Sequence, residues 1–159
     1  MDNRQEKAKE IQLVIFRIGK EEFGAEISSV LEISRVLEIT HLPQAPGFIE
    51  GVVNLRGKVV AVVDLHRQFG LASPEARPKT ARIIVVEIQK ETIGFLVDEV
   101  PEVLRIPETQ LEPTPELIQS RIKKDYIKGV GKLGSRLVIL LDLNQILAPQ
   151  ALKELEGLG

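Results

Sequence analysis

Short runs of apolar residues alternate with polar turns along most of the chain, and this pattern predicts a protein built mainly from β-strands. The runs are rich in valine and isoleucine and are bounded by glycine, proline or charged residues. Residues 59–63 are apolar at every position, which predicts a strand buried on both faces. The strands predicted in this way cover residues 13–18, 23–27, 51–55, 58–65, 82–89 and 92–98, with a further hairpin over 129–143.

Residues 55–57 connect two of these strands, and they predict a three-residue hairpin loop. Gly57 stands at the third loop position, where a left-handed backbone favours glycine. Arg56 then lies at the tip of a hairpin between two apolar strands. The residues alone leave two interpretations of Arg56 open: a solvated turn residue, or a side chain presented to a partner.

Helices are predicted at few places. Asp64 has the position of an N-cap for a short helix over residues 65–69, and Gly70 is its stop signal. Residues 30–37 are compatible with a short helix that runs into a strand, so the element type stays open there. Further predicted segments are a short helix over 116–125 and a C-terminal helix over 144–155 with a break near Pro149. Loops are predicted over residues 107–115 and 73–79, and the second of these is expected to be mobile.

The two halves of the chain carry an internal repeat. Residues 51–65 lie over residues 129–143 at a shift of 78, and six of the 15 positions are identical. At a shift of 70, residues 18–24 lie over residues 88–94. The same shift of 70 matches Val30 with Val100 and Glu32 with Glu102. The alternative, chance alignment of strand-rich segments, explains these matches less well than two copies of one small β unit.

The repeat predicts how the two copies pack. Each copy has about 60 residues and few aromatic side chains, so it would be marginally stable alone. We therefore expect the two copies to share one core. The matched pairs expected at corresponding buried positions are Val60 with Val138 and Val62 with Leu140.

Composition narrows the possible functions. The 159 residues carry a net charge of −2 and only 4% aromatic residues, which argues against a nucleic-acid-binding barrel or an anionic membrane surface. Cysteine is absent, which excludes disulfides and thiolate chemistry. No apolar run approaches the roughly 18 residues of a membrane span, and residues 1–10 lack the apolar region of a signal peptide. These observations favour a soluble cytosolic protein with one domain.

Motifs for chemistry are weak. Residues 129–134 match the dinucleotide pattern G-x-G-x-x-G, but a predicted strand follows them, whereas the motif requires a helix N-terminus. His41 and His66 have no partner at metal-ligand spacing, so we interpret them as a loop residue and a helix-face residue. Asp64 and Asp142 are repeat-equivalent and are predicted to be helix caps. We therefore expect no enzymatic activity, no cofactor and no metal.

The chain resembles the CheW family of chemotaxis coupling proteins over residues 12–147. The densest match is residues 46–65, PGFIEGVVNLRGKVVAVVDL, which looks like the family signature. The supporting stretches, in the correct order, are residues 24–33, 94–100, 129–134 and 140–143.

The resemblance implies a mainly β fold of two small five-stranded SH3-like β-barrels, which are intertwined, share a core and carry short helices. It also implies a non-enzymatic adaptor that couples the cytoplasmic tip of methyl-accepting chemoreceptors to the regulatory domain of the histidine kinase CheA. Such an adaptor is cytoplasmic, is recruited to receptor arrays, inserts into no membrane, binds no nucleic acid and is a monomer when isolated. The kinase-facing residues are left unassigned.

The resemblance further implies a receptor-facing groove. It includes Val30, Glu32, Arg56 and Val103, and Glu32 and Arg56 are expected to lie close together. Because a receptor tip is a helical hairpin, this would be recognition of a helix in a groove.

The expected organisation is a flexible N-terminal tail over residues 1–10, a CheW-like domain over 11–148 and a C-terminal helical tail over 149–159. The repeat covers approximately residues 12–70 and 82–147 of that domain. Two alternative functions stay open: an adaptor in a pilus-motility or other receptor-kinase array, and, from another class, a small-ligand-binding β-barrel. The low aromatic content and the lack of convergent polar groups argue against the ligand-binding barrel.

Overall fold

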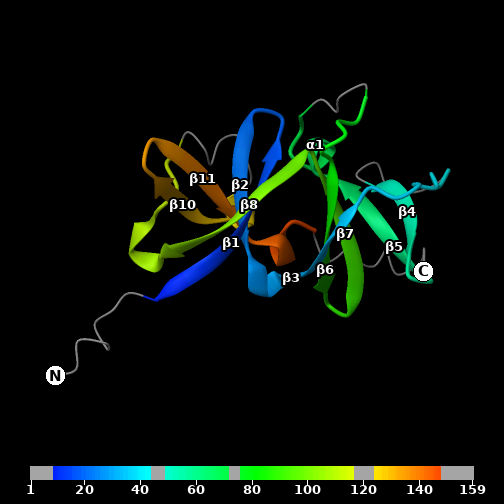
Figure 1. The fold of residues 1–159 in the computed structure, drawn as a ribbon, viewed down its shortest axis with the longest axis horizontal. Coiled ribbons are helices and arrows are strands. Elements are labelled where there is room, and N and C mark those ends of the chain that lie inside the picture. The colour runs from blue at the N-terminus through cyan, green and yellow to red at the C-terminus, as the bar shows by residue number, and fades with distance from the viewer. Residues whose placement is uncertain (1–8, 44–48, 72–75, 117–123, 148–159) are drawn as a thin grey trace.

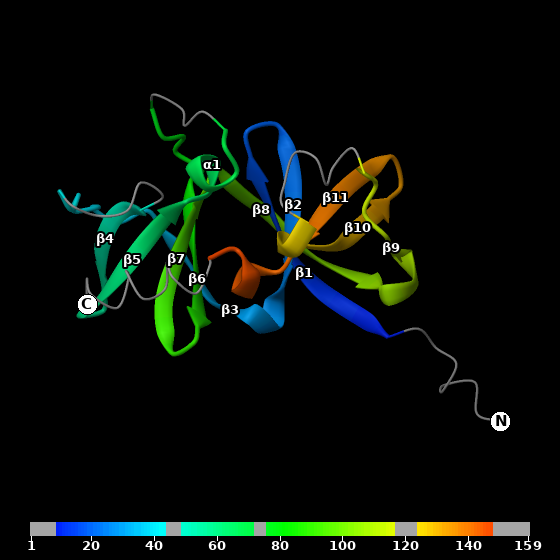
Figure 2. The ribbon, with the colours of Figure 1, turned by 180° about the vertical axis from the view of Figure 1, so that it is seen from behind.

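The computed structural model describes residues 9–43, 49–71, 76–116 and 124–147. These residues form two β-sheets and one short α-helix, arranged as two lobes side by side (Figures 1 and 2). The strands are β1 (Glu10–Ile18), β2 (Glu21–Glu26), β3 (Val30–Arg35), β4 (Ile49–Leu55), β5 (Lys58–Asp64), β6 (Arg82–Ile88), β7 (Glu91–Val97), β8 (Glu99–Pro107), β9 (Leu111–Glu112), β10 (Ile127–Leu133) and β11 (Arg136–Leu141). The helical elements are α1 (Leu65–Gln68) and 3-10 turns at Ile27–Ser29, Glu108–Gln110, Lys124–Tyr126 and Leu143–Gln145.

The two lobes exchange strands. The six-stranded lobe has the order β8-β1-β2-β11-β10-β9, and the five-stranded lobe has the order β3-β6-β7-β5-β4. The hairpin β1–β2 from the first half of the chain joins β8–β11 from the second half. In return, the hairpin β6–β7 from the second half joins β3, β4 and β5 from the first half. In each sheet the exchanged hairpin is attached through one parallel strand pair, β2 with β11 and β7 with β5. This exchange intertwines the lobes and confirms the mainly β, two-lobed fold.

In each lobe, the chain that follows one edge strand pairs with a strand at the other side of the sheet. In the five-stranded lobe the chain beyond β3 pairs with β4 through a bridge between Thr40 and Val52. In the six-stranded lobe β8 leads through a 3-10 turn to β9, where Glu112 pairs with Val130. Val52 and Val130 are matched by the repeat at the shift of 78, so the two lobes close at equivalent points.

The core has three groups of buried side chains. The largest lies between the lobes and includes Phe16, Phe23 and Phe95. A smaller group fills the inside of each lobe, one with six buried residues and the other with five. Because successive strand residues point to opposite faces, strands such as β1 and β5 contribute to the shared core and to one lobe at the same time.

The paired core positions are buried as predicted, but they do not lie in the shared core. Val60 and Val62 fill the five-stranded lobe, and Val138 and Leu140 fill the six-stranded lobe. The shared core is built by their neighbours on the opposite strand faces, such as Val63. The internal repeat predicts which positions of the two lobes are equivalent. It does not predict which face of each strand packs against the other lobe, because that depends on the strand exchange.

The structure decides one segment that the sequence left open, adds one strand that was not predicted and corrects one predicted loop. Residues 30–35 form strand β3 with alternating burial, and a 3-10 turn over Ile27–Ser29 precedes the strand. Residues 99–107 form strand β8, which was not predicted because Pro101 and Pro107 are unfavourable residues in a strand. Residues 107–115, interpreted as loop, contain a 3-10 turn and the short strand β9.

Several predictions lie outside the described residues. These are most of the N-terminal tail over residues 1–10, the first part of the loop over 73–79, most of the helix over 116–125 and the C-terminal helical tail over 149–159. Where the helix over 144–155 was expected to begin, the described part is a single 3-10 turn. No helix among the described residues is long and apolar enough to cross a membrane.

A glycine at each closure point allows two backbones to approach closely. A Cβ added at Gly51 would lie 2.3 Å from the Thr40 carbonyl oxygen, and one at Gly129 would lie 2.9 Å from the Glu112 carbonyl oxygen. We expect Gly129→Ala to destabilise the protein by about 1–3 kcal/mol, as overpacking against backbone does. Gly131→Ala is the matched control on the same strand, because its Cβ would have only ordinary van der Waals contacts. Its neighbours would be side-chain carbons of Ile106 at 3.5 Å and Leu111 at 3.8 Å and the Val138 carbonyl oxygen at 3.9 Å. Urea unfolding of both variants checks this, and equal destabilisation would contradict the role assigned to Gly129.

Candidate functional site

The β4–β5 hairpin presents Arg56 at its tip. The turn has two residues, Arg56 and Gly57, and both have left-handed backbones, with φ of 54° and 83°. This corrects the predicted three-residue loop: the two positive φ angles are those of a type I′ turn, whose twist matches the flanking strands. The Asn54 side-chain oxygen accepts a hydrogen bond from the Gly57 N–H at 2.8 Å and braces the turn.

Glu32 holds the Arg56 guanidinium with two hydrogen bonds. Nη1 donates to Oε1 at 2.9 Å and Nη2 donates to Oε2 at 3.0 Å. Glu32 lies on β3, at the opposite edge of the sheet, and 25% of its side chain is exposed against 78% for Arg56. A bidentate pair fixes the plane of the guanidinium and leaves its other N–H groups facing solvent. The structure thus brings together the two residues that were expected to be close.

The two valines of the predicted groove lie in different places. Val30 is half-buried at the start of β3 and packs against the shared core. Val103 is 45% exposed on β8, an edge strand of the six-stranded lobe, opposite Val14 of β1. At the repeat shift of 70, Val103 corresponds to Ile33, which is also exposed.

Two exposed aliphatic side chains on β3 were not predicted from the sequence as candidate functional residues. Leu31 and Ile33 flank Glu32, and 59% and 39% of these residues are exposed. The available signal was the alternation in the segment VLEISR, which indicates a half-exposed strand once the helical alternative is set aside.

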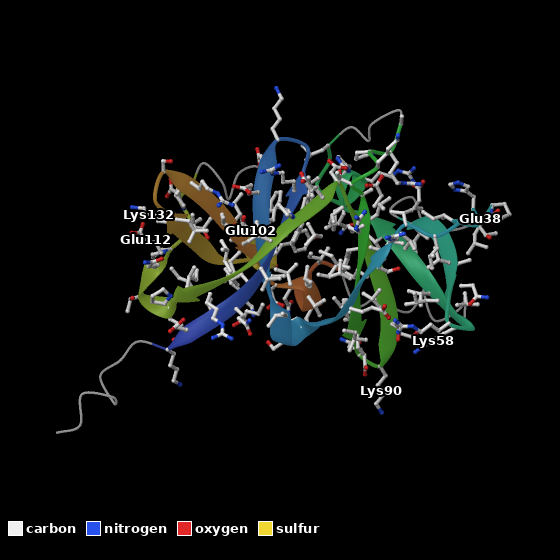
Figure 3. The ribbon with its side chains drawn as sticks, viewed as in Figure 1. Glu38, Lys58, Lys90, Glu102, Glu112 and Lys132 are labelled. Carbon is white, nitrogen blue, oxygen red and sulfur yellow. The ribbon has the colours of Figure 1, made fainter. Side chains whose placement is uncertain are left out.

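The equivalent hairpin of the six-stranded lobe has a different charge arrangement. Arg136 donates to both carboxylate oxygens of Glu22 at 2.9 Å and also pairs with Glu102 at 3.3 Å. Its repeat counterpart Lys58 instead donates to the Thr92 hydroxyl at 2.7 Å. Figure 3 shows Lys58 at the end of one lobe and the ion pair of Lys132 with Glu112 at the end of the other. The two lobes share a fold but present different surfaces.

The hydrogen bonds from Arg136 hold the pKa of Glu22 below the ordinary glutamate value of 4.5, and they outweigh the opposing effect of burial. Because the folded-state pKa is the lower one, this stabilisation is complete above 4.5 and is lost as the pH falls through the folded-state value. We expect the Tm to fall on acidification below 4.5 more steeply in the wild type than in Arg136→Gln. Thermal melts across that range check this, with Lys132→Gln as the exposed control on the same hairpin. Identical slopes in the wild type and Arg136→Gln would contradict it.

His66 lies on helix α1 as predicted, and its side chain is buried. Its Nδ1 lies 3.3 Å from Asp64 Oδ1, and its Nε2 lies 3.0 Å from Asp98 Oδ2. Asp98 connects β7 to β8, and its carboxylate also accepts the Gly19 N–H from the β1–β2 turn at 2.7 Å. These contacts link helix α1 to both lobes, so the group has a structural role. His41 lies in a loop as predicted and its Nδ1 is 2.8 Å from the Glu50 carbonyl oxygen.

The remaining candidate motifs are structural. Asp64 caps α1 by accepting the His66 N–H, and Asp142 caps the equivalent 3-10 turn by accepting the Asn144 N–H. The glycine-rich residues 129–134 lie in β10 and its turn, and strand β11 follows them. No helix N-terminus is therefore available at this motif for a phosphate. In the described ranges, no group of three His, Asp or Glu side chains has the geometry of a metal site.

Residues 12–151 match the family model described as the CheW-like domain. This chain belongs to the CheW family. The match spans both lobes and both repeats, so CheW membership covers the Arg56 hairpin and its counterpart alike.

Individual CheW relatives are similar over nearly their whole length. The chain is 36% identical over 146 residues to the chemotaxis protein CheW of Helicobacter pylori, covering 91% of this chain and 87% of that protein. It is 34% identical over 146 residues to CheW of Thermotoga maritima, with 92% and 93% covered. The crystal structure of the scaffolding protein TtCheW from Thermoanaerobacter tengcongensis superposes with a TM-score of 0.80 at 34% identity, covering 90% of this chain and 91% of that one.

Proposed function

We propose that this protein is a non-enzymatic adaptor that couples the cytoplasmic tips of chemoreceptors to the histidine kinase CheA. The observation that carries the proposal is the Arg56 hairpin, whose guanidinium is held by Glu32 while 78% of the arginine side chain stays exposed. The relatives support it, because they are named chemotaxis proteins and one is described as a scaffolding protein.

The receptor-facing surface comprises Val30, Glu32, Arg56 and Val103. Arg56 contributes the polar contact, since its planar fork of donors suits a backbone or carboxylate oxygen of a receptor helix. Glu32 positions that fork, and the two valines contribute apolar area on the two lobes. A helical hairpin, which offers an apolar face with flanking polar groups, matches this combination.

The kinase side of the adaptor is the regulatory domain of CheA. In this account the protein is cytoplasmic, becomes part of the receptor array through its two partners and is a monomer when isolated. Its function requires two separate binding surfaces and no chemistry, which fits a fold whose two lobes present different side chains.

A pull-down tests the proposal. The purified chain is immobilised and offered a receptor-tip fragment and the CheA regulatory domain in separate experiments. Retention of both is the expected result. Retention of neither, with the chain shown to be folded by circular dichroism, would overturn the proposed adaptor role.

A further inference from the structure

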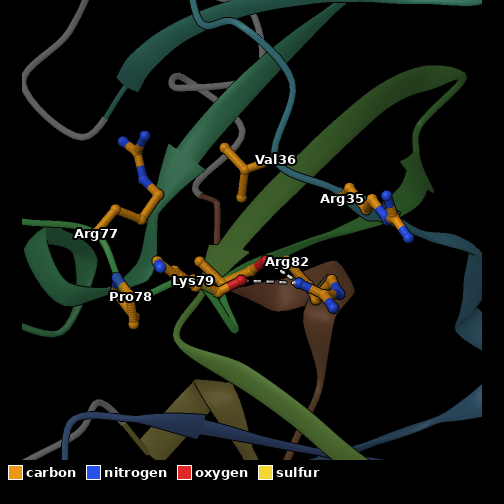
Figure 4. Close-up of a pocket in the computed structure, with 7 residues that line it drawn as sticks. Arg35, Val36, Arg77, Pro78, Lys79 and Arg82 are labelled. Carbon is orange, nitrogen blue, oxygen red and sulfur yellow. Dashed lines mark hydrogen bonds between the residues drawn. The ribbon is translucent and has the colours of Figure 1, made fainter.

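The five-stranded lobe carries a pocket lined mainly by cations. Its volume is about 420 Å³, and Arg35 from β3, Arg82 from β6, and Arg77 and Lys79 from the preceding loop surround it (Figure 4). Val36 and Pro78 contribute apolar lining. The whole chain has a net charge of −2, so this cluster is a local concentration of positive charge rather than a reflection of composition.

Three of these cations lack an acidic partner within the described part of the chain. Arg77 pairs with Glu50 at 3.1 Å, but no carboxylate of a described residue lies within ion-pair distance of Arg35, Lys79 or Arg82. Arg82 Nη1 donates to the carbonyl oxygens of Ala81 at 2.7 Å and Lys79 at 3.4 Å, the bonds drawn in Figure 4. These bonds orient the guanidinium without neutralising its charge.

The strand register places two of these cations opposite each other, which lowers the stability of the folded protein. Arg35 and Arg82 are direct cross-strand partners in the antiparallel β3–β6 pair. Like charges directly opposite each other on a sheet destabilise it. A bound anion would offset that repulsion, so the pair has the character of a binding feature rather than of a stabilising one.

The surroundings of the pocket indicate what kind of anion fits. Ile33 and Arg35 lie on the same face of β3, because they are two residues apart, and both are exposed. An exposed aliphatic side chain beside a cluster of cations suits a polypeptide that carries both carboxylates and aliphatic groups. A small phosphate would use the cations and leave Ile33 unused.

We propose that this pocket and the adjoining face of β3 bind an acidic polypeptide segment of a partner protein, with glutamate or aspartate carboxylates at Arg35, Lys79 and Arg82. The site is separate from the receptor contact proposed above, because Glu32 points to the opposite face of β3. The proposal therefore stands or falls independently of that contact.

Charge reversal of Arg35 tests the site. The probe is a short fluorescent helical peptide of leucine, alanine and glutamate, compared with a twin that has glutamine at every glutamate. Arg35→Glu is expected to weaken binding of the glutamate peptide roughly tenfold at low salt. The same change is expected to raise the Tm, because it replaces a repulsive cross-strand pair with an attractive one. A purely structural role of Arg35 would not combine weaker binding with higher stability.

Arg105→Glu is the matched control, because Arg105 is the repeat counterpart of Arg35 on β8 and is exposed, but its cross-strand partner is Gln12. It is expected to leave peptide binding unchanged. Equal affinity of the wild type for the two peptides, or an equal loss in Arg105→Glu, would overturn the proposal. Displacement of the peptide by millimolar inorganic phosphate would overturn it too, by identifying a phosphate site.

Discussion

Val62→Asp is expected to unfold the protein at ambient temperature. Val62 is completely buried on β5, between the partner strands β4 and β7, and it packs inside the five-stranded lobe. A carboxylate there has no hydrogen-bonding partner and loses its hydration, which costs at least about 4 kcal/mol. Since a domain of this size has a total stability of roughly 5–15 kcal/mol, little or none would remain.

Val59→Asp provides the matched control three residues away on the same strand. Val59 is 57% exposed, so the same chemical change should alter stability by about 1 kcal/mol or less. Circular dichroism and thermal melts of the two variants measure the difference. A cooperative melt of Val62→Asp with the wild-type midpoint would show that the core has been assigned wrongly.

Arg56→Ala is expected to fold normally and to bind a receptor-tip fragment about 30-fold more weakly, the loss typical of an interface hot spot. The Arg56–Glu32 pair is exposed on the arginine side and contributes only about 0.2–1 kcal/mol to folding. Arg56→Ala should therefore lower receptor binding strongly while it changes the free energy of unfolding only slightly. A binding titration and a thermal melt on each variant measure both quantities.

Glu32→Ala should weaken binding in the same direction, because the guanidinium loses its fixed orientation. The double variant should lose less than the sum of the single losses if the two residues act as a unit. Lys132→Ala is the control, since Lys132 is an exposed cation paired with a glutamate on the equivalent hairpin of the other lobe. Wild-type receptor binding by Arg56→Ala would remove the hairpin tip from the functional surface.

Local signals in the sequence predicted the features that depend on neighbouring residues. The caps at Asp64 and Asp142 follow from an acidic residue between an apolar strand and a helical turn, and both form. The burial of Val60 and Val138 follows from apolar runs and the repeat. These outcomes rest on periodicity and turn chemistry, which a single sequence contains.

Features that depend on distant segments were not predictable in the same way. His66 is buried because Asp98, 32 residues away, closes over it at the joint between the lobes. The Arg35–Arg82 juxtaposition arises only from the register of β3 on β6, which the strand exchange creates. The proximity of Glu32 and Arg56 came from the family resemblance, because no local pattern brings β3 to the β4–β5 hairpin.

The most direct test of the adaptor account is a bridging measurement. A receptor-tip fragment is attached to a biosensor surface, and the CheA regulatory domain is passed over it with and without this protein. The account predicts capture of the regulatory domain only when the wild-type protein is present, and greatly reduced capture with Arg56→Ala. Equal capture with and without the protein, or none in either case while each partner binds it separately, would contradict the claim that it couples the two.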